Sequence, residues 1–312
     1  MAEPKEVPVD PAEARMTAEL GAPSQKIGVQ RFNCGGQSPV HETVAAEEPL
    51  EIRIEFGPRN ERVNRAISIT MRTPCNDREL AVGFLYTEGV IRDADEIDEA
   101  AEPDEESRAR SSVCVKLAPD VEVNTGSLSR NFYTTSSCGI CGKASLLALQ
   151  TVCPPRIRNT FEISAEMLFR LPGLLRARQA VFEQTGGLHA AALFTAEGEL
   201  ESLREDVGRH NALDKLIGAA LLEDRAPLRD CVLMLSGRAS FELLQKALMA
   251  GIPMVAAVGA PSSLAVQVAR EFDITLIGFL RGDHFNVYNG AERIRAAVSS
   301  ELSMEQAQSF SV

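Results

Sequence analysis

The sequence predicts an α/β protein, α+β overall, in which a small strand-rich N-terminal domain precedes a larger three-layer α/β domain. Two observations predict this division. Up to about residue 135, short segments alternate apolar and polar residues, as half-buried strands do. From about residue 160, short apolar runs are interleaved with helical segments, which predicts a largely parallel sheet covered on both faces. The chain of 312 residues, 45% of them hydrophobic, is long enough for both domains.

Strict alternation of apolar and polar residues predicts the strands of the N-terminal domain. The expected strands are 50–56, 66–71 and 113–117. Between the second and the third, residues 79–86 predict a short helix that ends before Gly89. We expect this small domain to span 27–135. Residues 1–26, rich in Ala, Pro and Glu, are expected to form a disordered tail.

Apolar runs and helical periodicity predict the elements of the second domain. The expected strands are 190–194, 231–235, 254–258 and 275–280. The expected helices are 143–150, 208–222 with its apolar residues on one face, 241–248, and one capped by Ser262 or Ser263. We expect this domain to span 146–300 and a tail to follow at 301–312.

Charge and cysteine usage narrow the function classes. The 44 acidic and 32 basic residues give a net charge of −12, which argues against binding of nucleic acid over the whole surface. The sequence has no apolar run as long as a membrane span needs and no signal-peptide pattern at its start. Seven irregularly spaced cysteines in a chain with a large core indicate a reducing compartment, so we expect a cytoplasmic protein. The acidic stretch 93–106 is expected to be a solvated insert, or else a docking surface for a basic partner.

Cys138 and Cys141 form the most informative motif of the chain, a CxxC in a polar segment rich in Gly, Ser and Thr. We expect residues 134–145 to be a mobile loop, able to carry a reactive sulfur between two places. An ordinary thiol is only about 3% ionised at pH 7, and Lys143 can raise that fraction. The sequence contains no second CxxC or CxxH to complete a zinc site, and a thioredoxin-like pair would follow a strand.

Three other polar groups are candidates for binding. His189 lies in a motif that resembles the His-x-Glu of zinc nucleobase deaminases, but Ala191 replaces the proton-shuttling Glu, so neither deamination nor zinc is expected. Arg209, His210 and Lys215, at a helix entrance, are expected either to hold phosphate or to belong to an ordinary capped surface helix. Glycine-containing turns at 236–240, 259–263 and 278–286 each follow an apolar strand. Together they predict a crevice for a phosphorylated ligand at the carboxyl ends of the strands.

These residues, in this order, resemble the FdhD family, the sulfur-carrier proteins required to make formate dehydrogenase active. The matching stretches are EEPL at 47–50, ELAVGFL at 79–85, SCGICG at 137–142, GLHAA at 187–191, EDVGRHNALDK at 205–215, SGRAS at 236–240 and NVY at 286–288. The likeness covers residues 28–295.

The resemblance implies a cytidine-deaminase-like fold for the second domain and a sulfurtransferase activity. A cysteine desulfurase would donate persulfide sulfur to Cys138, with Cys141 assisting, and the sulfur would pass to a bound Mo-bis(molybdopterin guanine dinucleotide), or its tungsten form, destined for formate dehydrogenase. The family's cofactor-contact segment corresponds to Leu280, Arg281, Gly282, Asp283, His284 and Phe285. The resemblance also implies a homodimer.

Two questions stay open at the level of sequence. Cys141 could release the sulfur by attacking Cys138, which leaves a disulfide, or could help to hold it. The alternative function is a molybdenum-cofactor-binding chaperone without sulfur chemistry, for which both cysteines would be dispensable.

Overall fold

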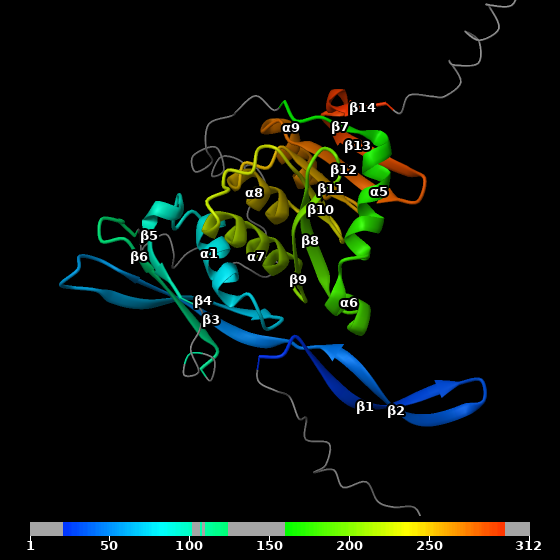
Figure 1. Cartoon of the computed structure of the whole chain (residues 1–312), viewed down its shortest axis with the longest axis horizontal. Coiled ribbons are helices and arrows are strands. Elements are labelled where there is room, and N and C mark those ends of the chain that lie inside the picture. The colour runs from blue at the N-terminus through cyan, green and yellow to red at the C-terminus, as the bar shows by residue number, and fades with distance from the viewer. Residues whose placement is uncertain (1–20, 102–106, 108–109, 124–159, 297–312) are drawn as a thin grey trace, which may run out of the picture.

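The computed structural model describes residues 21–101, 107, 110–123 and 160–296 (Figure 1). The predicted loop 134–145 with both motif cysteines, the predicted helix 143–150 and the predicted tail 301–312 lie outside the described residues. Most of the predicted N-terminal tail does so too, but the first strand already begins at Ser24, inside the segment 1–26.

The first two strands form a hairpin that projects from the body (Figure 1). Strand β1 (Ser24–Asn33) pairs with β2 (Gly36–Ala45) antiparallel along its whole length, and the described residues supply no third strand. The hairpin contacts the short helix α6 (Ala180–Thr185) through β2, while Phe32 near the hairpin tip is 73% exposed. Sequence analysis did not single out this hairpin, because its alternation is weak and polar residues dominate it.

A four-stranded sheet follows, in the order β4-β3-β6-β5, with α1 (Asp77–Thr87) beside it. Its strands are β3 (Glu48–Phe56), β4 (Val63–Arg72), β5 (Ile97–Ala100) and β6 (Ser112–Leu117). The predicted strands and helix of this region are confirmed, and in β3 the alternating residues Leu50, Ile52 and Ile54 are buried. The 3-10 turn η1 (Ala94–Glu96) and β5 lie within the acidic stretch 93–106, so part of that stretch is an edge strand rather than a free insert.

The second sheet has six strands in the order β13-β12-β11-β10-β8-β9. Its strands are β8 (His189–Phe194), β9 (Leu200–Asp206), β10 (Val232–Leu235), β11 (Met254–Ala257), β12 (Thr275–Arg281) and β13 (His284–Asn289). Strands β10, β11 and β12 are mutually parallel, whereas β8, β9 and β13 run antiparallel to their neighbours. The expectation of a largely parallel sheet was therefore wrong. Hairpin returns, which sequence analysis did not identify, supply β9 and β13.

Helices cover this sheet on both faces, as expected, and so make three layers (Figure 1). In β10, Leu233 and Leu235 face α7 (Arg209–Leu222), α8 (Phe241–Met249) and α9 (Ser263–Glu271). Val232 and Met234 face α5 (Ala165–Arg176) instead. Near the end of the described chain, the 3-10 turn η3 (Ala291–Arg293) leads into the short strand β14 (Ile294–Arg295), which pairs in parallel with β7 (Ile163–Ser164), just before α5.

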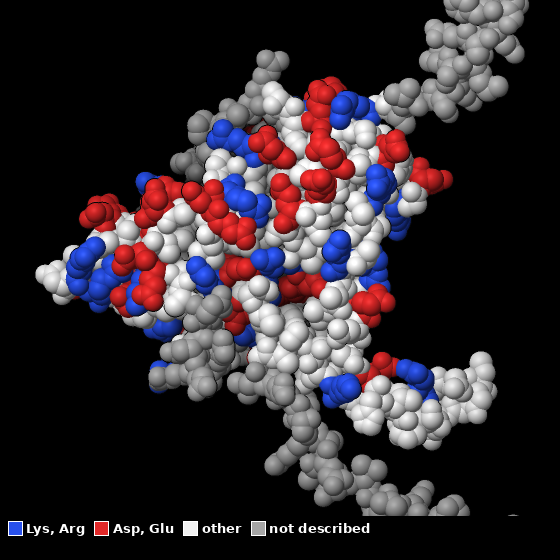
Figure 2. Space-filling view, viewed as in Figure 1, with Lys and Arg blue, Asp and Glu red and all other residues white. Residues whose placement is uncertain are grey.

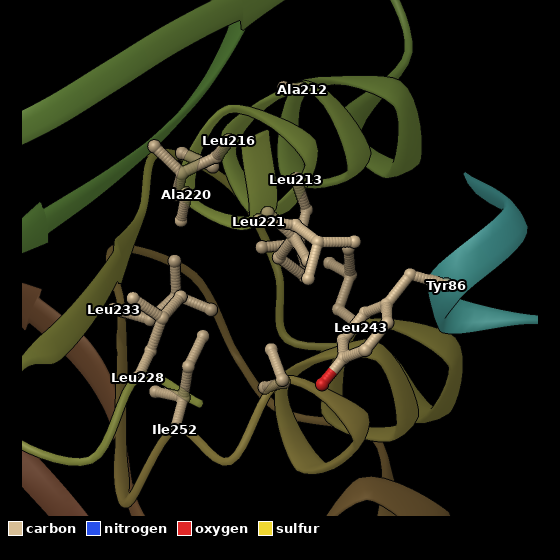
Figure 3. Close-up of a cluster of buried hydrophobic side chains, with 14 of the residues drawn as sticks. Tyr86, Ala212, Leu213, Leu216, Ala220, Leu221, Leu228, Leu233, Leu243 and Ile252 are labelled. Carbon is tan, nitrogen blue, oxygen red and sulfur yellow. The ribbon is translucent and has the colours of Figure 1, made fainter. Parts of the chain in front are cut away.

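Helix α7 is the centre of the molecule rather than a surface helix. Every residue from Asn211 to Leu221 is buried, because α7 is enclosed by the large sheet, by α8 and by α1 (Figure 3). Gly83 of α1 and Gly218 of α7 make the crossing possible: a Cβ on either would lie 1.9 Å from a backbone oxygen of the other helix. The prediction of apolar residues on one face of 208–222 was therefore too narrow. One continuous core joins both sheets.

Candidate functional site

The three glycine-containing turns meet at the carboxyl edge of the parallel strands, as the sequence predicts. Ser236, directly after β10, accepts a hydrogen bond on its Oγ from the backbone N–H of Ala190 at 2.8 Å. The N–H of Gly259 donates to the carbonyl of Gly237 at 2.9 Å, and the N–H of Phe279 donates to the carbonyl of Gly259 at 3.1 Å. These backbone bonds link the ends of β8, β10, β11 and β12 into one continuous edge.

His189 lies at this edge, at the first position of β8. A Cβ on Gly237 would lie 3.3 Å from its Nδ1, so the absence of a side chain at Gly237 leaves room for the imidazole. Burial lowers the pKa of His189, and the charge of Arg209 lowers it further, against the opposing effect of Asp206. The ring is therefore neutral at neutral pH, and it can donate one hydrogen bond and accept another.

The entrance of α7 lies at the same edge, because Asp206 at the end of β9 pairs with His189. Among the described residues, Nε of Arg209 and Nε2 of His210 are buried and have no hydrogen-bond partner. The nearest acid is Glu242, whose Oε2 lies 4.0 Å from Nε2 of His210. Burial, with the charges of Arg209 and Lys246, lowers the pKa of His210 to about 4.

Lys215 does not join these two residues, so the expectation that it holds phosphate is corrected. Its Nζ lies 2.7 Å from Oδ2 of Asp206 and 2.8 Å from the carbonyl oxygen of Thr73. The side chains of Lys215 and Asp206 are 1% and 0% exposed. Asp206 also accepts hydrogen bonds from the backbone N–H groups of Thr73 and Gly208 and from Asn211. This pair holds β9, α7 and the end of β4 together and is closed to a ligand.

The segment 280–285 forms the β12–β13 turn at the far end of the same edge. Leu280 is fully buried and anchors the turn in the core beneath α5. Arg281, Gly282, Asp283 and His284 are exposed. Oδ1 of Asp283 lies 3.1 Å from Nδ1 of His284, and this hydrogen bond lowers the pKa of Asp283. Phe285 is partly buried, with its ring centroid 5.1 Å from that of Phe169 on α5.

A backbone irregularity places this turn. Between the pairs Gly278–Asn286 and Arg281–His284, two residues of β12 oppose one residue of β13, which is a β-bulge. Phe279, in the bulge, has a φ of 54°, a left-handed conformation that costs an L-residue about 1–2 kcal/mol. Strained residues of this kind cluster at ligand clamps, active sites and switch regions, and bulges next to such sites redirect side chains.

Apart from Cys34, which is exposed on the hairpin, the described cysteines have raised thiol pKa values and are therefore poor nucleophiles. Burial raises the pKa of the Cys75 and Cys114 thiols and raises that of Cys231 to about 12. Cys138, Cys141 and Cys153 lie outside the described residues. The structure brings together His189, the α7 entrance and the segment 280–285, and it leaves the position of the CxxC open.

Sequence analysis missed two side chains that belong to this edge. Glu242 comes two residues after the identified turn 236–240 and could have been identified as the first acid of the next helix. Phe169 has no such signal, because an aromatic residue on an amphipathic helix looks like any other residue of the core.

Charges are intermixed over the face shown in Figure 2, and the β1–β2 hairpin is largely uncharged there. Within the described ranges, no group of three or more His, Cys, Asp or Glu side chains is arranged to hold a metal ion. Nor does any described helix have the length and apolar character needed to cross a membrane.

The fold and this edge define a class: a three-layer α/β protein whose strand ends form a glycine-rich edge that carries His189, Arg209 and the exposed turn with Arg281. A sequence profile of the FdhD/NarQ family matches residues 45–295. The chain is 51% identical over 288 residues to a "Sulfur carrier protein FdhD" of Streptomyces avermitilis, and that alignment covers 90% of this chain and 99% of the other. It is 50% identical over 263 residues to one of Mycobacterium tuberculosis, covering 81% and 92% of the two chains.

Among solved structures, a "putative formate dehydrogenase accessory protein" from Desulfotalea psychrophila superposes with a TM-score of 0.66. That alignment covers 87% of this chain and 99% of the other, at 24% identity, so it supports the fold alone. The chain belongs to the FdhD/NarQ family. The predicted resemblance and the α/β fold class are confirmed, whereas the domain boundaries and the cytidine-deaminase-like detail stay predictions.

Proposed function

We propose that this protein is a sulfurtransferase that carries persulfide sulfur on Cys138 to a molybdenum or tungsten bis(molybdopterin guanine dinucleotide), for use by formate dehydrogenase. One observation carries the proposal: the CxxC at 138–141 lies within the matched range 45–295, in a chain about half identical to proteins named sulfur carriers. The raised pKa values of Cys75, Cys114 and Cys231 support it, because a sulfur carrier needs a thiolate.

The chemistry of loading is a transfer of sulfane sulfur between two thiols. The Cys138 thiolate attacks the outer sulfur of a persulfide on a cysteine desulfurase and forms a new S–S bond. The old S–S bond breaks, and the donor leaves as a thiolate, so no oxidant or reductant is consumed. The attacking sulfur must be ionised, which the positive charge of Lys143, two residues after Cys141 in the sequence, favours.

The strand-edge site suits the acceptor, which carries guanine nucleotide groups. Arg209, with Nε buried and unpaired among the described residues, offers a donor to a phosphate oxygen. Neutral His189 and His210 add hydrogen-bond donors without excess charge. At the other end of the edge, the exposed turn 280–285 adds Arg281.

Mass spectrometry of the whole protein tests this function. After incubation with a cysteine desulfurase and cysteine, we expect the wild-type chain to gain one sulfur atom on the peptide that contains Cys138. Cys138→Ala should gain none, should fold and bind GDP normally, and should fail to restore formate dehydrogenase activity in cells that lack the endogenous protein. Cys34→Ala, which removes an exposed thiol of the hairpin, is the matched control and should load normally.

The result that overturns the proposal is equally direct. A Cys138→Ala protein that still matures formate dehydrogenase would favour the chaperone alternative, in which the protein binds the cofactor and carries no sulfur.

We also propose that the protein is a homodimer. Among the described residues, the exposed large hydrophobic side chains are Phe32, Val63, Ile69, Met71 and Phe169, and the first four lie on β1 or on the edge strand β4. A two-stranded hairpin is marginally stable alone in water, and exposed edge strands attract a partner strand. Light scattering should give a molecular mass of twice the chain mass of 33.8 kDa, and the Ile69→Asp variant should have the mass of a single chain.

A further inference from the structure

Aromatic side chains gather at the β12–β13 turn. The protein has 13 Phe, 3 Tyr and no Trp in 312 residues, yet Phe169, Phe279 and Phe285 all lie on this turn or against it. The rings of Phe169 and Phe285 are tilted by 51° with centroids 5.1 Å apart, which is a favourable aromatic geometry. Phe169 is nevertheless 40% exposed, so much of its ring remains open to solvent.

The support beneath this pair is rigid. Leu168 and Leu171, on the buried face of α5, and Leu280, in the turn, are each 0% exposed. All three belong to the core between α5 and the large sheet, and Phe285 packs against that core. An exposed ring held on a packed base keeps a fixed orientation, which lowers the entropy lost when a flat ligand stacks on it.

Two exposed arginines belong to the same elements as the pair. Arg170 follows Phe169 on α5, and Arg281 precedes Phe285 on the turn, and both are exposed. The nearby acid Asp283 is 99% exposed and hydrogen-bonded to His284. Flat rings on two elements that each also carry an exposed arginine match a ligand that joins an aromatic base to phosphates.

We propose that Phe169 and Phe285 form a stacking platform for the guanine ring of the bound nucleotide, which adds α5 to the site, with Arg170 and Arg281 facing its phosphates. The inference rests on the proposed function, which supplies a guanine nucleotide as part of the acceptor. Phe169 lies outside the family segment 280–285, and no sequence motif marks it.

Calorimetric titration of the full-length protein with GDP tests the platform. Stacking on one aromatic side chain changes affinity by roughly 5- to 100-fold, and we expect Phe169→Leu to weaken GDP binding by that factor. Phe169→Tyr, which keeps the ring, should bind GDP as the wild type does. Phe32→Leu is the matched control, the same change at an exposed Phe of the distant hairpin, and should have no effect.

Inorganic pyrophosphate is the second probe, because it has phosphates and no ring. Phe169→Leu should bind pyrophosphate with wild-type affinity, whereas Arg281→Gln should weaken both ligands. If wild type binds GDP and Phe169→Leu binds it equally well, or loses pyrophosphate to the same extent, the platform is wrong and the proposed function stands. If wild type binds no GDP, both fail.

Discussion

Helix α7 and the β12–β13 turn have a similar polar composition but opposite structural roles. Both are rich in charged and hydrogen-bonding residues, and both are expected from sequence to touch a phosphorylated ligand. In α7, Lys215 is 1% exposed and fully paired, whereas Arg281 and Asp283 of the turn are open to solvent. A polar motif therefore identifies a binding site only when its side chains are free of internal partners.

The buried charges of α7 instead hold the two halves of the chain together. Lys215 and Asp206 bind the backbone of Thr73 at the end of β4. The residue just before Lys215 in α7 is Asp214, whose Oδ2 lies 2.9 Å from Nζ of Lys246 on α8 and whose Oδ1 accepts a hydrogen bond from Thr87 of α1. Because a buried charge is costly unless it is paired, these contacts favour this docking of α1 and β4 on α7 over one that leaves a charge unpaired.

Removal of one buried charge should give the largest effect. Lys215→Met removes the ion-pair partner of the buried Asp206 side chain, so we expect it to lower the free energy of unfolding by about 3–5 kcal/mol, measured by urea denaturation. Lys116→Met is the matched control: it breaks an exposed pair with Glu99, whose side chain is 52% exposed, and should change the free energy of unfolding far less than Lys215→Met does.

Lys215→Met also tests whether α7 and the β12–β13 turn really differ in role. If Lys215→Met kept its stability and lost affinity for GDP, α7 would belong to the ligand site after all. If it loses stability while the folded fraction binds GDP normally, the helix is structural at this position.

The helix crossing should give the second-largest effect. Gly218→Ala places a methyl group 1.9 Å from the carbonyl oxygen of Glu79, so α1 and α7 must move apart, at a cost of about 2–3 kcal/mol. Gly173→Ala in α5 is the control, since its Cβ meets no atom within 4 Å and alanine favours a helix by about 1 kcal/mol. Equal stability of the two variants would contradict the close crossing.

Local pattern was enough to predict most of the fold. The alternation in β3, the apolar runs of β8, β10, β11 and β12, and the Ser262 cap of α9, whose side chain accepts from the N–H of Ala265, all agree with the structure. The mixed sheet was not predictable in this way, because β9 and β13 carry polar residues and their direction depends on hairpin turns. The burial of α7 on all sides could not be predicted either, because polar residues such as Asn211, Asp214 and Lys215 usually mark the solvent-exposed face of a helix.

The position of the candidate site could be predicted from the sequence, but the side chains that are free to bind there could not. Three strand-end turns indicate an edge, because parallel strands end together. Which polar side chains remain free at that edge depends on tertiary partners: Arg209 and His210 keep unpaired atoms, and Lys215 does not. Phe169 reaches the edge only through the packing of α5.

His210 lies at the boundary between the buried helix α7 and the open strand edge. The pH dependence of protein stability should therefore show how far its side chain is buried. Its pKa falls from an ordinary 6.5 to about 4, mainly through burial, then through Arg209, Lys246 and His189, against Glu242. As pH falls, the unfolded chain takes up the proton first, so the stability contribution is present above about pH 6.5 and is lost between 6.5 and 4.

A non-titrating variant isolates this contribution. Between pH 7 and 5, wild type should lose more unfolding free energy than His210→Gln, by at most about 2 kcal/mol and by less after solvent screening, because the side chain is 37% exposed. Parallel pH profiles for the two proteins would mean that His210 is as open as the β12–β13 turn.

The smallest effects should come from two strained residues, one on each side of the comparison. Cys75, at the junction of β4 and α1, has a φ of 93°, and Phe279, in the bulge before the turn, has a φ of 54°. Glycine relieves left-handed strain of about 1–2 kcal/mol but adds chain entropy worth about 0.5–1 kcal/mol to the unfolded state. Cys75→Gly should therefore stabilise the protein by about 1 kcal/mol or less.

The two glycine variants should differ in binding. Phe279→Gly relieves the same kind of strain, but it also frees the bulge that fixes the direction of Arg281, whose guanidinium lies 5.8 Å from the Phe279 ring centroid. We expect Phe279→Gly to weaken GDP binding and Cys75→Gly to leave it unchanged, as measured by calorimetry on the same preparations. Strain at the junction would then serve the fold, and strain at the turn would serve the ligand. Unaltered affinity in both variants would remove that distinction.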